Sequence, residues 1–243
     1  MMETIKATLW IYRIAFTRSG QLVRENWAVV FAPFTYSVFL SVAGISLIPF
    51  GLVGGLLLLL ASNACMSSGL HLLENILNSR KANVNDFLKG FTVYLWEIVR
   101  ISFILWIPMM LVSSVLVQTP NGPIIIMFIQ IALYIILNAV PELIYQSRAS
   151  GVEILVASYH FIIENWSEWF APNIIITFAG WAVMQALNPL ANAVAAPIYI
   201  FVIASLIGFF LTYLMIFRGL LFSELNGSNR RSRVYRYKAR NST

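Results

Sequence analysis

Charge is what this sequence has least of. Asp, Glu, Lys and Arg make up 11% of its 243 residues, whereas soluble domains carry about 25%. Three long stretches hold none of these four residue types: 28–73, 101–141 and 169–217. All 26 charged residues fall in the segments left over: 1–27, 74–100, 142–168 and 218–243. This distribution leaves no room for a separate soluble catalytic domain.

Cysteine is nearly absent as well. The single cysteine, Cys65, excludes an internal disulfide and a cysteine-based metal cage. Gly-rich phosphate loops, paired catalytic carboxylates and cofactor motifs are also missing. The two histidines, His71 and His160, lie in separate segments and make a poor metal set. We therefore expect no enzyme activity, no cofactor and no metal. We expect no cleaved signal peptide either, because the first apolar run starts only near Trp27.

The sequence does contain long apolar stretches. A helix needs about 20 apolar residues to cross a bilayer, so each uncharged stretch can cross twice. Pro and Gly interrupt each stretch near its middle, around 46–51, 118–123 and 187–190, and these residues end helices and make turns. The sequence predicts an all-α integral membrane protein with six spans in three hairpins, at about 28–48, 51–69, 101–117, 124–140, 170–187 and 191–217.

The positive-inside rule sets the orientation. The three predicted turns carry no Lys or Arg, while the other side of the membrane carries all sixteen. Basic loops stay in the cytoplasm, so we expect both termini there. An even number of crossings also requires the two termini to lie on the same side of the membrane, which agrees with this orientation. The predicted location is the plasma membrane.

The charged segments carry their own helical pattern. In each of the first three, apolar residues recur at helical spacing, as do Ile5, Leu9, Tyr12 and Phe16 in the first. Helices of this kind lie along a membrane surface. We expect one membrane domain over 1–225, made of three units, 1–73, 74–141 and 142–225, in which an amphipathic interfacial helix precedes each hairpin.

The tail at 226–243 is polar and basic, and we expect it to be disordered. Its cations are predicted to contact anionic lipid headgroups, each contributing about 1 kcal/mol near the surface. They are Arg230, Arg231, Arg233, Arg236, Lys238 and Arg240. Nucleic acid is a poorer partner, because these residues form a juxtamembrane tail and not a folded patch.

One motif occurs twice. Residues 25–33, ENWAVVFAP, return at 164–172 as ENWSEWFAP, with six of nine positions identical. Trp suits the headgroup level, Pro is tolerated in a first helical turn, and Glu and Asn can receive free amides at a bend. We expect an interface elbow built from Glu25, Asn26, Trp27, Pro33, Glu164, Asn165, Trp166 and Pro172. The alternative is a ligand site made from the two Glu-Asn pairs.

This order of segments resembles a family group. The resemblance lies in three segments: "NVNDFLKGF" before the second hairpin, "AVPELIYQSRASGVEILVASYHFIIENW" before the third, and "FRGLLFSEL" closing the last span. The chain is similar over nearly its whole length to the bacterial six-helix membrane proteins related to YciC and to the membrane domain fused to some glycerophosphodiester phosphodiesterases. The resemblance implies six helices and a bacterial plasma membrane. It implies no catalytic residues.

A few polar residues lie at or in the spans. Glu97, Arg100 and Glu142 sit at span edges, where Glu142 could approach Arg100 across a hairpin. Charges at membrane depth are functional suspects, but long side chains at span edges reach water by snorkelling. A structural ion pair and a role in transport both fit. Gln130 would extend a transport pathway into the fourth span.

We therefore expect a non-enzymatic multi-pass protein with a structural, lipid-organising or partner-binding role. Its partners would be membrane lipids, another membrane protein or a second copy of itself, and no nucleic acid. The alternative is a small transporter or channel with a pathway near Glu97, Arg100, Glu142 and Gln130.

Overall fold

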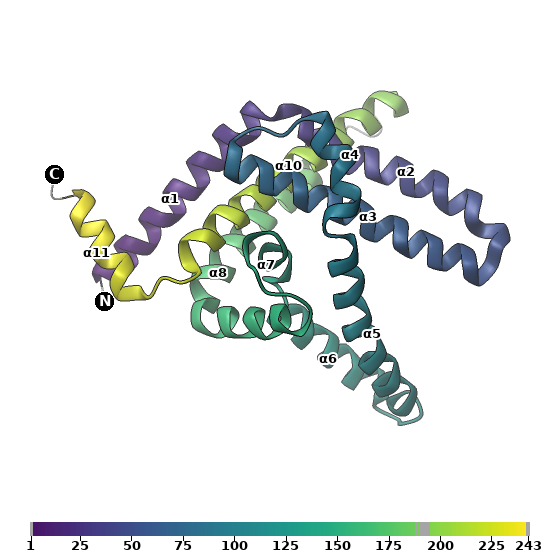
Figure 1. Ribbon diagram of the computed structural model, residues 1–243. Helices are drawn as coiled ribbons and strands as arrows, with labels where there is room; N and C mark the ends of the chain where they lie inside the picture. The colour runs from purple at the N-terminus through teal and green to yellow at the C-terminus, as the bar shows by residue number, and fades with distance from the viewer. Residues whose placement is uncertain (1, 188, 190–194, 242–243) are drawn as a thin grey trace. The chain divides into compact units, whose positions relative to one another are not determined.

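The structure is a computed structural model that describes residues 2–187, 189 and 195–241, with side chains for all of these except 2, 196–198, 240 and 241. Within that part of the chain every regular element is a helix. In order they are α1 (Met2–Glu25), the 3-10 helix η1 (Trp27–Phe31), α2 (Ala32–Leu47), the 3-10 helix η2 (Ile48–Phe50), α3 (Gly51–Ser79), α4 (Val84–Val93), α5 (Leu95–Leu116), α6 (Gly122–Ile136), α7 (Val140–Gln146), α8 (Val152–Leu187), α10 (Ala196–Leu225) and α11 (Arg230–Asn241) (Figure 1). The expected all-α class is confirmed.

Among the described residues, five helical segments are long and apolar enough to cross a membrane: Trp27–Ser79, Leu95–Leu116, Gly122–Gln146, Val152–Leu187 and Tyr199–Leu225. The first has 53 residues and includes the first two predicted spans. The predicted sixth span begins at 191–194, outside the described residues. The chain is an all-α multi-pass membrane protein.

Large apolar side chains on these segments are exposed. Leu52 is 80% exposed, and Ile45, Phe128 and Ile175 each expose more than 60% of their surface. Soluble proteins rarely expose such continuous apolar surface. In hydrocarbon the same side chains contact lipid tails as apolar as themselves, so they need no protein cover.

The first predicted turn is present. Gly51 adopts φ +53°, a left-handed conformation that glycine tolerates best. At Gly54 an added Cβ would lie 2.1 Å from the carbonyl oxygen of Leu47, so the chain reverses tightly over 47–54. A second break lies where predicted, because α5 ends at Leu116 and α6 begins at Gly122.

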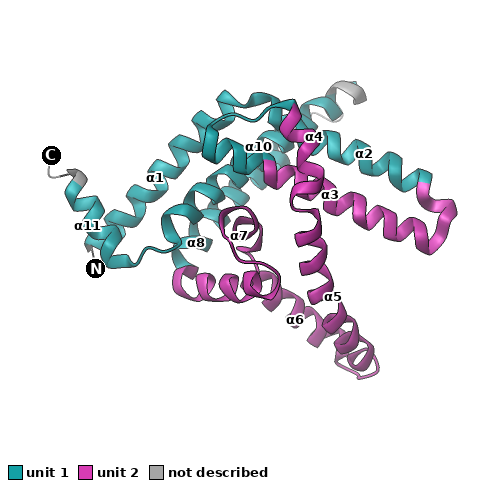
Figure 2. Cartoon of the chain, in the orientation of Figure 1, with its two compact units in different colours: residues 1–46, 72–84, 167–243 teal, residues 47–71, 85–166 magenta. Residues whose placement is uncertain are grey.

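The contacts divide the chain into two compact units, shown in Figure 2. Unit 1 comprises 1–46, 72–84 and 167–243, and unit 2 comprises 47–71 and 85–166. These boundaries differ from the three sequential units that the sequence predicts.

In unit 1, α1 packs against α10. The face of α1 that packs is made of small and aliphatic residues, including Ala7, Ile11, Ala15 and Ser19, all buried. Helix α10 also meets η1 closely, because a Cβ at Gly208 would lie 2.0 Å from the carbonyl oxygen of Val30. The large apolar residues of α1 lie on its other face, where Ile5, Leu9 and Phe16 are each more than half exposed.

In unit 2, α4 is held against α3 by serine hydroxyls. Ser67 donates to the carbonyl of Gly90 at 2.6 Å and accepts from the amide of Tyr94 at 2.8 Å. Ser68 donates to the carbonyl of Phe87 at 2.7 Å. A Cβ at Gly90 would lie 2.8 Å from the Cα of Ser68, so this close approach requires glycine.

The tail differs from its prediction. The sequence predicts disorder over 226–243, whereas Arg230–Asn241 form helix α11. The reason is that acidic residues elsewhere in unit 1 pair with its cations, as described below. Composition alone does not reveal these partners.

Candidate functional site

The two copies of the repeated motif share a local structure. Asn26 has φ −121° and ψ 38°, and Asn165 has φ −124° and ψ 16°, so each interrupts helical geometry. Each side-chain amide donates to the carbonyl four residues earlier, Asn26 to Leu22 at 2.9 Å and Asn165 to Phe161 at 3.2 Å. Such side-chain bonds compete with the helical backbone pattern. The asparagine therefore marks a bend in both copies.

Asn26 also holds a distant loop in place. Its amide donates to the carbonyl of Arg80 at 2.8 Å, and its oxygen accepts from the amide of Ala82 at 2.9 Å. These bonds engage both ends of a buried side chain. The neighbouring Glu25 is exposed and accepts from the amide of Gln21 at 2.8 Å. In the first copy, the polar atoms of the Asn26 side chain are therefore already bonded within the protein, which argues against the alternative ligand site there.

The tryptophans of the motif are exposed to nearly the same degree, Trp27 by 68% and Trp166 by 63%. Glu164 is exposed as well. The prolines differ in their setting, because Pro33 lies in the first turn of α2 while Pro172 lies inside α8.

Pro172 has a structural consequence. Proline has no amide hydrogen, so the carbonyl four residues earlier loses its helical donor. That carbonyl belongs to Glu168, and it accepts a hydrogen bond from the hydroxyl of Tyr12 at 2.9 Å. In the first copy the corresponding carbonyl, that of Val29, accepts from the amide of Ala32 instead.

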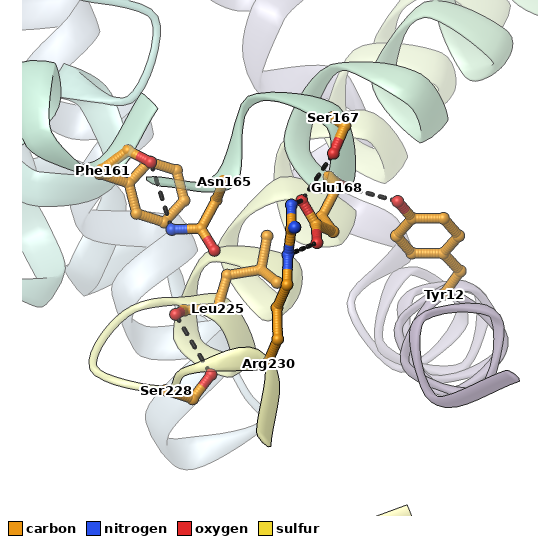
Figure 3. A network of polar contacts seen from close by, with 8 residues as sticks. All are labelled: Tyr12, Phe161, Asn165, Ser167, Glu168, Leu225, Ser228 and Arg230. Carbon is orange, nitrogen blue, oxygen red and sulfur yellow. Dashed lines mark hydrogen bonds and ion pairs between the residues drawn. The ribbon is translucent and has the colours of Figure 1, made fainter. Parts of the chain in front are cut away.

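The side chain of Glu168 is the centre of a polar cluster in unit 1 (Figure 3). It is only 7% exposed, while that of its partner Arg230 is 56% exposed. The guanidinium donates through Nε to Oε1 at 2.7 Å and through Nη2 to Oε2 at 3.2 Å. Ser167 donates to Oε2 at 2.8 Å. A bidentate arginine–carboxylate pair of this kind is among the stronger charge-assisted hydrogen-bonded interactions.

Two further groups respond to this carboxylate. Burial and, to a smaller extent, the negative charge of Glu168 together raise the pKa of Tyr12 to about 12. Burial also lowers the pKa of Arg233, a change that the charge of Glu168 partly offsets. The pKa of Arg230 is raised, first by its hydrogen bond to Glu168. Near neutral pH the cluster contains one negative charge and two positive charges.

The rest of α11 pairs with acidic residues in the same way. Arg236 lies 3.1 Å from Glu224, and Lys238 lies 2.6 Å from Glu3. The hydrogen bond from Lys238 lowers the pKa of Glu3. Of the six predicted lipid-contacting cations, three are therefore in ion pairs, Arg233 is buried and Arg231 is exposed. The side chain of Arg240 lies outside the described residues.

A cavity of about 530 Å³ adjoins the Glu168 cluster in unit 1. Eight residues line it, from α1, α8 and α11: Thr4, Ile5, Thr8, Leu9, Tyr12, Ser167, Glu168 and Arg230. Its lining combines hydroxyls and an ion pair with the apolar side chains of Ile5 and Leu9. Such a combination suits an amphipathic ligand.

The predicted charges of unit 2 are only partly brought together. Arg100 lies 3.0 Å from Glu97, whose other oxygen accepts from the amide of Gly151. Glu142 is not part of this pair and is fully buried in the first turn of α7. Gln130 lines a different cavity, of about 480 Å³, with Leu56, Leu59, Ser102, Phe103, Leu105, Trp106, Met109 and Leu133.

Sequence reasoning missed Glu168. A sign of it lies in the repeat, where Glu168 takes the position that Val29 holds in the first copy. It is also the last charge before the third uncharged stretch. The sequence pattern predicts Tyr12 on an apolar stripe, whereas its hydroxyl donates to the Glu168 carbonyl.

Comparisons with protein-family models, with curated proteins and with solved structures found no match to this chain. The resemblance drawn from the sequence therefore stays a prediction.

Proposed function

We propose that this chain is a non-enzymatic protein of the bacterial plasma membrane that crosses it six times, as three hairpins, with both termini in the cytoplasm. The distribution of charge supports this topology, because every Lys and Arg lies outside the uncharged stretches. The tight reversal at Gly51 supports two crossings within Trp27–Ser79. The expected resemblance to the YciC-related group agrees with it.

The repeated motif forms the elbows of this arrangement. In each copy a bend at asparagine is followed at once by an exposed tryptophan. Indole rings favour the headgroup level of a bilayer, so the bend is where a surface helix turns into the membrane. The exposed apolar stripe of α1, at Ile5, Leu9 and Phe16, would then face lipid.

The role we propose is structural: the protein organises lipid or accompanies another membrane protein. The observation that carries this proposal is the lining of the 480 Å³ cavity within the spans. Gln130 and Ser102 are its polar lining residues, and the other seven are apolar. Solute pathways through membranes are instead lined by polar and charged groups. Glu97, Arg100 and Glu142 do not line this cavity.

The second candidate is a small transporter or channel, with a pathway near Glu97, Arg100, Glu142 and Gln130. One observation favours it: Glu142 is fully buried, and ionisable groups buried at a span often serve ion or proton movement. The Glu97–Arg100 pair, by contrast, has an arginine that is 55% exposed, as expected for a charge at a span edge.

In this proposal, the exposed cations of the tail still interact with anionic lipid. Arg231 is exposed, and the cations of the three ion pairs are also about half exposed. A half-exposed cation keeps part of its interaction with negatively charged headgroups. The tail would thus be docked on the protein and still face the membrane surface.

Water access to position 130 tests the two candidates. With Cys65→Ser as background, Gln130→Cys is treated in membranes with a small, charged, water-soluble thiol reagent, and Asn121→Cys in the predicted turn serves as the reactive control. The structural role predicts reaction at 121 and none at 130, because lipid and apolar side chains surround Gln130. Rapid reaction at 130 would indicate a water-filled pathway and would refute the structural role.

A further inference from the structure

The cavity beside Glu168 has the lining of a ligand-binding site. Its polar lining is made of three hydroxyls on α1, one on α8 and one ion pair: Thr4, Thr8, Tyr12, Ser167, Glu168 and Arg230. We infer that this cavity binds the phosphodiester headgroup of a membrane phospholipid, with Arg230 and the two threonines as its contacts. The inference rests on the proposed function, which places α1 and α11 at the cytoplasmic membrane surface.

Arg230 has donors to spare. A guanidinium carries five N–H groups in a planar fork, and the bonds from Arg230 to Glu168 use one on Nε and one on Nη2. Its side chain is 56% exposed at the cavity. The remaining N–H groups have the geometry that binds two oxygens of a phosphate at once. Glu168 thus orients the guanidinium and leaves part of it free for an anion.

The two threonines also support the binding of an anion in this cavity. Thr4 and Thr8 are four residues apart, so they lie on one face of α1, one turn from each other. Within the described part of the chain neither hydroxyl has a protein hydrogen-bond partner, whereas Thr17, farther along the helix, donates to the carbonyl of Arg13 at 2.9 Å. Both hydroxyls can therefore donate to an oxygen in the cavity.

The charge of the cluster matches one phosphodiester. Glu168 contributes one negative charge, and Arg230 and Arg233 contribute two positive charges that both act on it. The nearby acids Glu3 and Glu224 are balanced by Lys238 and Arg236. One positive charge is left over, which equals the charge that a phosphodiester would neutralise.

The apolar lining residues favour a lipid over free phosphate. Ile5 and Leu9 line the cavity next to Thr4 and Thr8 and are more than half exposed. A free phosphate would leave them in water, while the glycerol and first acyl carbons of a lipid would cover them. A volume of about 530 Å³ lies within the usual range of small-molecule sites, about 300–1,000 Å³.

The test is calorimetric titration of the full chain in a non-ionic detergent with dihexanoyl phosphatidylglycerol, glycerophosphate and inorganic phosphate. We expect saturable binding of the lipid and much weaker binding of the other two. Arg230→Gln should lower lipid affinity about tenfold or more, the size of a lost charged hydrogen bond. Arg231→Gln removes the same charge from the next position outside the cavity. In non-ionic detergent no anionic bilayer surface is present for this exposed cation to contact, so the affinity should change less than about twofold.

A second variant separates binding from docking of α11. Thr4→Val with Thr8→Val keeps the shape of the cavity wall and the Arg230–Glu168 pair, and it should weaken lipid binding several-fold. Three results overturn the inference: inorganic phosphate binding as tightly as the lipid, equal losses for Arg230→Gln and Arg231→Gln, or unchanged affinity in the threonine variant. Labelling at position 130 decides the proposed function separately, because it does not depend on headgroup binding.

Discussion

The hydroxyl of Tyr12 donates a 2.9 Å hydrogen bond to the backbone carbonyl of Glu168, the carbonyl that Pro172 leaves without a helical donor. The two residues are 156 positions apart. The bond therefore ties α1 to α8 near Pro172. It also brings the ring of Tyr12 next to the carboxylate that holds Arg230, so α1, α8 and α11 share one cluster.

Tyr12→Phe removes this bond and leaves a carbonyl that neither proline nor tyrosine satisfies. We expect a loss of about 1 kcal/mol in the free energy of unfolding, up to about 3 if no water replaces the hydroxyl. The measurement is unfolding of the purified protein in detergent. Tyr235→Phe is the matched control, because Tyr235 is 75% exposed. Equal stability of the two variants would contradict the assigned role of the bond.

Glu168→Gln tests the anchor of the tail. The amide cannot balance the charge of Arg230, and we expect α11 to be held about 1–2 kcal/mol less tightly, a small value because Arg230 is half exposed. Trypsin should then cut the tail about tenfold faster under conditions where local opening limits cleavage.

Glu153→Gln is the control for the tail experiment, since Glu153 is an exposed acid in the first turn of the same helix. It should leave the cleavage rate unchanged. A tail that is cut equally fast in wild type, Glu168→Gln and Glu153→Gln would mean that this ion pair does not hold α11.

Asn26→Ala removes three side-chain hydrogen bonds, to Leu22, Arg80 and Ala82. With each bond contributing about 1 kcal/mol, we expect the variant to lose about 3 kcal/mol of stability. Hydrogen exchange should rise in the loop at 80–82 before it rises in the α1 core. Asn85→Ala, at an exposed position of α4, should change neither. If both variants behave alike, Asn26 does not organise the elbow.

Gly208 and Gly44 offer a matched pair of glycine substitutions. Alanine at 208 would place a methyl group 2.0 Å from the Val30 carbonyl oxygen, whereas alanine at 44 meets nothing within 4 Å. We expect Gly208→Ala to force α10 away from η1, with a loss of at least 1–3 kcal/mol. Gly44→Ala should be neutral or slightly stabilising. Detergent-solubilised yield and thermal unfolding of both variants check this, and equal behaviour would argue against the α10–η1 contact.

The membrane character of the chain could be predicted because it depends on local composition. Stretches such as 28–73, which are uncharged over tens of residues, are typical of membrane-spanning segments. The bends at Asn26 and Asn165 could be predicted for a related reason, since the motif that makes them is repeated. In both cases the information lies within a short stretch of sequence.

The polar cluster could not be predicted, because its members are distant in sequence. Nothing near Glu168 indicates that Arg230 pairs with it, 62 positions away. The helix at 230–241 was missed for the same reason, because its stability depends on acids at positions 3, 168 and 224. The face of α1 that meets α10 could not be predicted, because alanines and a serine make up much of it beside Ile11. Small residues allow the closest helix contacts, but they give a weak periodic pattern.

Cysteine labelling of intact cells tests the central claim, the topology, most directly. In a Cys65→Ser background, single cysteines replace Asn121, Lys81 and Tyr235, three exposed positions, and a membrane-impermeant maleimide is added outside. The account predicts labelling at 121 in intact cells, and labelling at 81 and 235 only after permeabilisation. Labelling at 81 or 235 in intact cells, or an unreactive 121 beside a reactive external control, would contradict it.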